Sequence, residues 1–273
     1  MRLVRLGLTG LVLLAYLALA LPVQLVAVRA GWRIAAWIPV IFHRLTLWLL
    51  DVRVTSIGTP PDGEPSLVLA NHSSWLDIVV IGSLRPLAFV AKSEIAGWPV
   101  IGLFADLQRT VYIERARRSH TAEVNETVAR RLARGEIVVL FPEGTTNDGN
   151  RLLPFRSSLV GAAGAVLTET GAGSVRLQPL SVAFTRRNGL PVTRRERPAI
   201  AWYGSMELAP HLKAFLSDGP LDVEATWGEP ILFDHTLDRK RAAALAEAAV
   251  REGVKRSLSG ANRLSGGAGA GRR

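Results

Sequence analysis

The expected fold rests on one stretch of sequence, Ser66-Leu-Val-Leu-Ala-Asn-His-Ser-Ser-Trp-Leu-Asp-Ile-Val-Val80. It begins as an apolar run of strand length, breaks into small polar residues at Asn71 and becomes apolar again at Trp75. This order predicts a buried strand, a polar turn and a helix with a serine as its N-cap. In α/β proteins, sites are built in the turns that follow buried strands.

His72 and Asp77 lie on either side of this polar turn. Their side chains can meet if the turn folds His72 back over the first turn of the helix. A carboxylate on one imidazole nitrogen fixes the tautomer and leaves the other nitrogen as a proton acceptor. The pair is therefore a candidate general base, although a lone histidine of this kind is also compatible with a purely structural role.

Beyond residue 51, strand-like apolar runs alternate with helical stretches. This alternation predicts an α/β fold with a largely parallel sheet flanked by helices. Strands are expected at 66–70, 86–91, 110–113, 136–141, 175–184, 199–203 and, at a sheet edge, 221–227; helices are expected at 119–134, 157–168 and 238–258, with a broken helix at 93–107.

The first fifty residues are strongly apolar. Residues 6–28 are long enough, as a helix, to span roughly 30 Å of hydrocarbon. Residues 34–50 predict an interfacial or re-entrant helix, or a second helix packed on the first. The alternative is a signal peptide cleaved after Ala18-Leu-Ala20, but the apolar run continues past that point. We therefore expect membrane-anchoring helices over 1–50, a globular domain over 51–258 and a disordered basic tail over 259–273.

Composition narrows the function. The formal charge is +10, from 33 basic and 23 acidic residues, and the chain has no cysteine. Disulfides, thiolate metal sites and a cysteine acyl-enzyme are excluded. The basic excess fits an anionic membrane or a phosphate-bearing ligand as partner. The sequence offers no nucleic-acid-binding motif and no metal-binding motif, so neither partner is expected.

Two further polar patches follow predicted strands. Glu114-Arg115 closes the strand at 110–113, and Pro142-Glu143-Gly144-Thr145 follows the strand at 136–141. Taken alone, the first is typical of a solvated face and the second of a simple turn. Together with the His72 turn they predict one site at a common edge of the sheet.

The motifs Asn71-His72-x4-Asp77, Val111-Tyr-Ile-Glu-Arg115 and Phe141-Pro-Glu-Gly-Thr145 resemble, in this order and spacing, those of the glycerolipid acyltransferase family. That family makes phosphatidic acid from lysophosphatidic acid, and the resemblance covers about residues 66–205. It implies a glycerolipid-acyltransferase-like domain, an acyl-CoA or acyl carrier protein thioester as co-substrate, and no other cofactor.

The resemblance also implies a role for each matching residue. His72 would be the general base on the lysolipid hydroxyl, with Asp77 holding its imidazole. Arg115 would bind the acceptor phosphate, and Glu143 with Gly144 would hold the glycerol part. Thr145 lies beside them as a further donor. Backbone N–H groups of the turn after the first strand are expected to stabilise the oxyanion.

One position departs from the family pattern. The family commonly places an arginine after Pro-Glu-Gly-Thr, and this chain has Thr146, so a phosphate contact is missing unless Arg151 or Arg156 replaces it. The stretches 148–156 and 202–211 also look like those of lyso-ornithine-lipid acyltransferases.

The expected activity is acyl transfer to 1-acyl-sn-glycerol-3-phosphate, a lysophospholipid, at the cytoplasmic side of the inner membrane. The alternatives are acylation of lyso-ornithine lipid and, in another class, an inactive membrane-anchored lipid-binding protein.

Overall fold

The computed structural model describes residues 2–62, 64–98, 101–113, 120–170 and 173–262. Strand β2 (Ser66–Ala70) forms where the apolar run predicts it, and all of its residues are buried. It lies in the middle of the sheet between β5 (Ile137–Leu140) and β6 (Val175–Arg187), and both run parallel to it. The turns that follow β2 and β5 therefore meet at one edge of the sheet.

The sheet is mixed but mostly parallel, which confirms the expected α/β fold class. The strand expected at an edge, β8 (Leu221–Trp227), is instead internal, because β1 (Val52–Ile57) pairs along its outer side. Antiparallel pairing is confined to the partners of β6, namely β7 (Leu190–Pro191), β8 and β9 (Ile231–Phe233). The strand order is β1-β8-β6-β2-β5-β3-β4, in which β3 is Ala88–Lys92 and β4 is Val111–Ile113.

Alternate residues of the central strands build two hydrophobic layers. Leu67 and Leu69 of β2 pack towards one layer, whereas Val68 and Ala70 pack towards the other, as the two-residue period of a strand requires. The first layer contains α5 (His120–Ala133), α6 (Gly161–Thr170) and α9 (Arg239–Ser259), and the second contains α2 (Ile34–Leu49), α3 (Leu76–Leu84) and α8 (Leu208–Phe215).

The C-terminal helix α9 has clear signals at both ends. The Asp238 side chain accepts hydrogen bonds from the N–H groups of Lys240 and Arg241, and Gly260 ends the helix in the left-handed region at φ 75°. Asn262 donates to Glu224 and to Ser257, so the described chain stays in contact with the domain as far as residue 262. The rest of the expected tail, 263–273, lies outside the described residues.

The strand expected at 199–203 is wrong. The chain forms the short helix α7 (Arg197–Ile200), with Pro198 in its first turn, and then leaves helical geometry at Ala201. Proline is favoured in the first turn of a helix, and it cannot donate to a strand ladder. The broken helix expected at 93–107 is present as the 3-10 turn η1 (Ser93–Gly97) and α4 (Ile101–Leu107).

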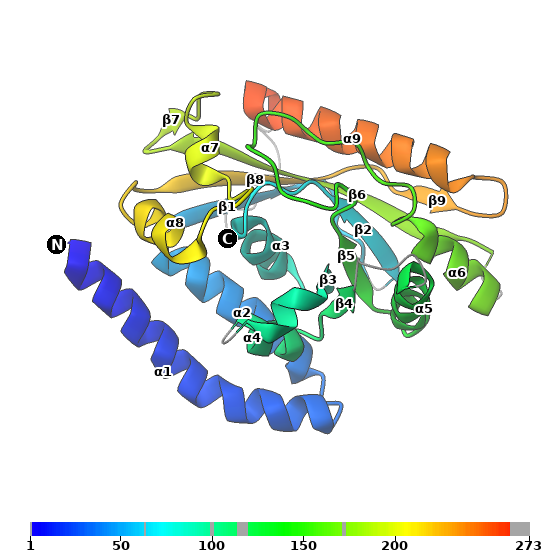
Figure 1. The fold of residues 1–273 in the computed structure, drawn as a ribbon, viewed down its shortest axis with the longest axis horizontal. Helices are drawn as coiled ribbons and strands as arrows, with labels where there is room; N and C mark the ends of the chain where they lie inside the picture. Colours follow the sequence, from blue (N-terminus) through cyan, green and yellow to red (C-terminus); the bar gives the residue numbers. More distant parts are fainter. Residues whose placement is uncertain (1, 63, 99–100, 114–119, 171–172, 263–273) are drawn as a thin grey trace.

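Helix α1 (Arg2–Arg29) runs along one side of the molecule and packs on α2 (Figure 1). Within the described chain, its segment Gly7–Arg29 is long and apolar enough to cross a membrane, judged by length and composition. Gln24 is buried, and its amide donates to the carbonyls of Ala35 (2.9 Å) and Leu107 (2.8 Å). The second apolar segment is therefore a helix packed on the first, as one of the expectations stated.

Candidate active site

The turn after β2 begins with Asn71, whose side-chain amide pairs with the backbone of β6 as a strand residue would. The amide of Asn71 donates to the carbonyl of Val182 (2.9 Å) and accepts from its N–H (2.8 Å). This pair of bonds continues the pairing of β2 with β6 by one side chain and fixes where the strand ends. The backbone immediately before His72 is therefore held in place.

His72 and Asp77 meet as the spacing predicts. Nδ1 of His72 lies 3.0 Å from Oδ2 of Asp77, and the same oxygen accepts from the N–H groups of Ser73 (2.7 Å) and Ser74 (2.9 Å). Asp77 is fully buried, whereas the His72 side chain is 17% exposed. Since a carboxylate with three donors is an acceptor, Nδ1 carries the proton and Nε2 is left as the basic nitrogen.

The predicted serine N-cap is absent. The N-cap of α3 is Trp75, which makes no side-chain cap, and the hydroxyl of Ser74 donates instead to the carbonyl of Ile200 (3.0 Å). The carboxylate of Asp77, in the first turn of the helix, satisfies the N–H groups that precede the helix. Neither serine side chain caps the helix; the backbone N–H groups of Ser73 and Ser74 bond to Asp77 instead.

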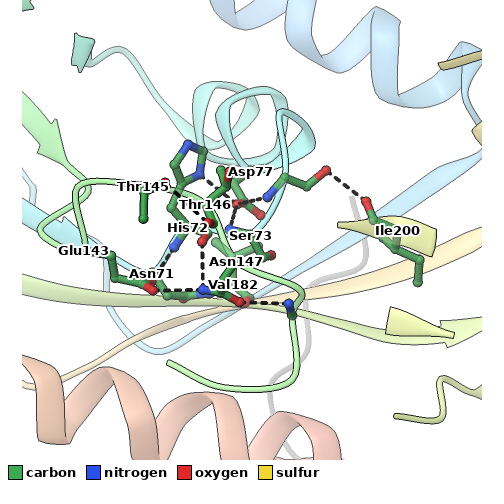
Figure 2. A network of polar contacts seen from close by, with 12 residues as sticks. Asn71, His72, Ser73, Asp77, Glu143, Thr145, Thr146, Asn147, Val182 and Ile200 are labelled. Atoms are coloured by element: carbon green, nitrogen blue, oxygen red, sulfur yellow. Dashed lines mark hydrogen bonds and ion pairs between the residues drawn. The ribbon is translucent and has the colours of Figure 1, made fainter. Parts of the chain in front are cut away.

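The turn after β5 reaches the same place from the neighbouring strand (Figure 2). Glu143 is 2% exposed, and its Oε1 accepts from the backbone N–H of His72 (2.8 Å). Its Oε2 accepts from the Asn147 amide (2.8 Å) and from the N–H of Leu153 (2.9 Å). The Asn147 amide also donates to the carbonyl of His72 (3.1 Å). Both backbone groups of His72 are therefore held by the second turn.

Opposing effects set the pKa of Glu143. Burial raises it to about 7, while hydrogen bonds from His72, Leu153 and Asn147 act to lower it and the nearby charge of Asp77 acts to raise it. The carboxylate was expected to contact the glycerol part of the acceptor. In the structure its two oxygens already accept hydrogen bonds from the chain, and one of these bonds holds the backbone N–H of His72. Its contact with the acceptor stays a prediction.

The remaining predicted residues are placed unevenly. Gly144 is buried at φ 73°, a conformation that favours glycine, and the Arg156 side chain lies against it. Thr145 is exposed, and its hydroxyl donates to the carbonyl of Thr146 (3.4 Å). Arg115, the expected phosphate ligand, lies outside the described residues.

The backbone N–H groups expected to stabilise the oxyanion already donate to carboxylates of the chain. The N–H of His72 donates to Glu143, and those of Ser73 and Ser74 donate to Asp77. These groups are therefore committed to fixing the turn. In the part of the chain that the structure describes, no group of three or more histidine or carboxylate side chains is arranged to hold a metal ion.

Sequence reasoning missed two residues that build this site. Asn71 was noted only as part of a motif, and Asn147 was not singled out. Their signal was their position, since each amide stands in a polar turn that directly follows a buried strand. Sequence does not reveal the distant partners, because the bond from Asn71 to Val182 joins residues 111 apart and the bond from Asn147 to His72 joins residues 75 apart.

A buried carboxylate bonded to a partly exposed imidazole is an arrangement typical of enzymes that use a general base. A family model described as Acyltransferase matches residues 51–182. A lyso-ornithine lipid O-acyltransferase of Brucella abortus is 44% identical over 85% of this chain and 86% of its own length. One of Rhizobium meliloti is 40% identical over 95% of this chain and 89% of its own.

A 1-acyl-sn-glycerol-3-phosphate acyltransferase of Neisseria meningitidis is 40% identical over 44% of this chain and 48% of its own. The crystal structure of the 1-acyl-sn-glycerophosphate acyltransferase of Thermotoga maritima shares the fold, with a TM-score of 0.55 and 20% identity over 79% of this chain and 77% of that one. The chain belongs to the lysophospholipid acyltransferase family. It is an acyltransferase that acts on lysolipids, and its apolar N-terminal helix associates it with a membrane.

Proposed function

We propose that this protein acylates the free hydroxyl of lyso-ornithine lipid, with His72 as the general base. The observation that carries the chemistry is the His72–Asp77 pair, which occupies Nδ1 and leaves Nε2 free to accept a proton on a side chain that is 17% exposed. In the reaction, Nε2 takes the proton of the acceptor hydroxyl while its oxygen attacks the thioester carbonyl of acyl-CoA or acyl carrier protein. The thiolate leaves and receives that proton from the imidazolium, so the base is restored. General-base catalysis of this kind contributes roughly 10²–10⁴ in rate.

The choice of acceptor departs from the lysophosphatidate expected from the motifs. The relatives that match most of the chain carry the lyso-ornithine name, whereas the 1-acyl-sn-glycerol-3-phosphate acyltransferase from Neisseria meningitidis matches less than half of it. Thr146 also stands where the family commonly has an arginine. Both observations support an acceptor whose head group is an amino acid rather than a phosphate.

Arg156 is our candidate for the carboxylate of that head group. Its guanidinium lies against Gly144, its backbone N–H donates to the carbonyl of Pro142 (2.9 Å), and its side chain is exposed. Among the described residues no carboxylate forms an ion pair with it. An arginine at this position suits a carboxylate because its planar fork can donate two parallel bonds. Arg115 and Thr145 remain candidate acceptor contacts.

We place the domain on the cytoplasmic side of the inner membrane, where acyl thioesters are made. The anchor is α1, and the formal charge of +10 favours a surface of anionic lipids. No cofactor beyond the thioester co-substrate is proposed.

The test is an acyl-transfer assay of membranes carrying the wild type or His72→Ala, with lyso-ornithine lipid and lysophosphatidate as acceptors and with each thioester as donor. We expect transfer to lyso-ornithine lipid to exceed transfer to lysophosphatidate and to fall at least a hundredfold in the variant, as expected for loss of a general base. Arg156→Gln should raise the KM for lyso-ornithine lipid roughly tenfold, the size of one lost charge-assisted bond. Wild-type transfer by His72→Ala would reject the base, and binding of lysolipid without turnover by the wild type would favour the inactive lipid-binding alternative.

A further inference from the structure

The three residues that follow His72 all bond to one distant part of the chain, residues 197–215, which we call the clamp segment. It contains α7, the irregular stretch around Trp202 and α8. The bonds run from Trp202 N–H to the Ser73 carbonyl (2.8 Å), from the Ser74 hydroxyl to the Ile200 carbonyl (3.0 Å), and from Trp75 Nε1–H to His211 Nδ1 (3.1 Å).

The contact between Trp75 and His211 fixes both side chains. Since the indole N–H can only donate, Nδ1 of His211 must accept, which requires a neutral ring with its proton on Nε2. Burial, the largest influence, lowers the pKa of His211, and this keeps the ring neutral around pH 7. The Trp75 ring also meets the ring of Phe215 edge-on, with centroids 5.8 Å apart. Helix α8 thus holds Trp75 by one polar and one aromatic contact.

The clamp segment lies beyond the residues that the Acyltransferase family model matches, which end at 182. The likeness to the Rhizobium relative spans 260 residues of this 273-residue chain and therefore includes it. The segment is thus outside the general acyltransferase match, yet it contacts the most important turn of the site.

We propose that His211 is a positioning residue of the acyltransferase. Through Trp75 it holds the turn that carries His72, so that Nε2 stands where it can reach the acceptor hydroxyl. The inference rests on the proposed role of His72 as base. The base must come within hydrogen-bond reach of the proton it takes, and a misplacement of about 1 Å can cost about a hundredfold in rate.

The test compares Trp75→Phe, His211→Leu and the double variant by kcat and KM in the acyl-transfer assay. Either single change removes the bond, and we expect kcat to fall roughly ten- to a hundredfold with the KM of both substrates little changed. Because both changes break one bond, the double variant should be no slower than the slower single variant. His211→Asn, whose amide oxygen can accept in place of Nδ1, should restore most of the lost kcat.

Trp227→Phe is the matched control. Trp227 is a buried tryptophan on β8 whose indole N–H donates to Ser56 on β1 (3.1 Å), two and three strands from β2, and it makes no hydrogen bond to the His72 turn in the described structure, so its loss should leave kcat near the wild type. Wild-type kcat in both Trp75→Phe and His211→Leu, or losses that multiply in the double variant, would overturn the positioning role. An active His72→Ala would instead overturn the base itself, so the two failures are distinguishable.

Discussion

The turns after β2 and β5 each bury one carboxylate, and the two carboxylates serve the same histidine in different ways. Asp77 bonds within its own turn, to the His72 ring and to the N–H groups of Ser73 and Ser74. Glu143 bonds across the sheet edge, to the backbone of His72 and to its own loop. One carboxylate therefore orients the imidazole, and the other places the backbone from which the imidazole projects.

This difference explains why the contact of Asp77 with His72 can be predicted from the sequence and the contact of Glu143 with His72 cannot. Asp77 needs only a short turn to reach His72, so spacing alone predicts the contact. Glu143 needs two strands to be neighbours in a parallel sheet before its contact with His72 exists. Both oxygens of Glu143 bond to the chain, and one of them holds the backbone N–H of His72.

The largest effect is expected from Asp77→Asn. The amide keeps the size of the side chain but loses the charge that stabilises the imidazolium, and it puts an NH2 group where Oδ1 now lies buried without a partner in the described structure. We expect kcat to fall about 10²–10⁴-fold, because the orientation and basicity of the imidazole both depend on this carboxylate. Steady-state kinetics would measure it, with Asp234→Asn, a carboxylate in an exposed turn, as the control. Retained activity would break the assignment of Asp77 as the orienting carboxylate.

The second effect is on stability and follows from the pKa of Glu143, which burial raises from 4.5 to about 7. Between these values the folded protein holds a proton that the unfolded chain releases, so the free energy of unfolding falls as pH rises through this window. Relative to Glu143→Gln, which does not titrate, the wild type should lose up to about 3 kcal/mol between pH 4 and 8. Denaturant unfolding in detergent at a series of pH values would measure it. A difference that stays constant with pH would contradict the effect of burial.

The smallest effect is expected from Glu143→Gln, which tests the role of Glu143 against that of Asp77. Glu143→Gln leaves an NH2 group facing at least one of the three N–H donors that the carboxylate now satisfies. If Glu143 braces the turn, kcat should fall roughly tenfold while the KM for the acceptor is unchanged, in line with the loss of one bond to a charged group. A raised acceptor KM with unchanged kcat would instead support a direct contact between Glu143 and the acceptor, as the sequence motif implies.

Much of the fold was predictable because it is local. The apolar runs of β2 and β5 and the apolar length of α1 are all properties of short windows. The wrong strand at 199–203 shows the limit, because the backbone there bonds to Ser73 rather than to a strand.

The same limit applies to the site. His72 and Asp77 could be paired from spacing, whereas the loss of the backbone N–H groups as oxyanion donors could not be foreseen. Those groups are occupied because two carboxylates converge on one turn, and only the folded chain reveals that convergence. The contribution of His211 is hidden for the same reason, since it lies over a hundred residues from Trp75.

Helix α3, which carries Asp77, packs against α2 at a position that leaves no room for a side chain. A methyl group added at Gly82 would collide with the ring of His43 on α2. Any larger residue at position 82 would push α2 away from α3, whose first turn carries Asp77. The absence of a side chain at this one position thus couples the packing of the N-terminal helices to the placement of the His72–Asp77 pair.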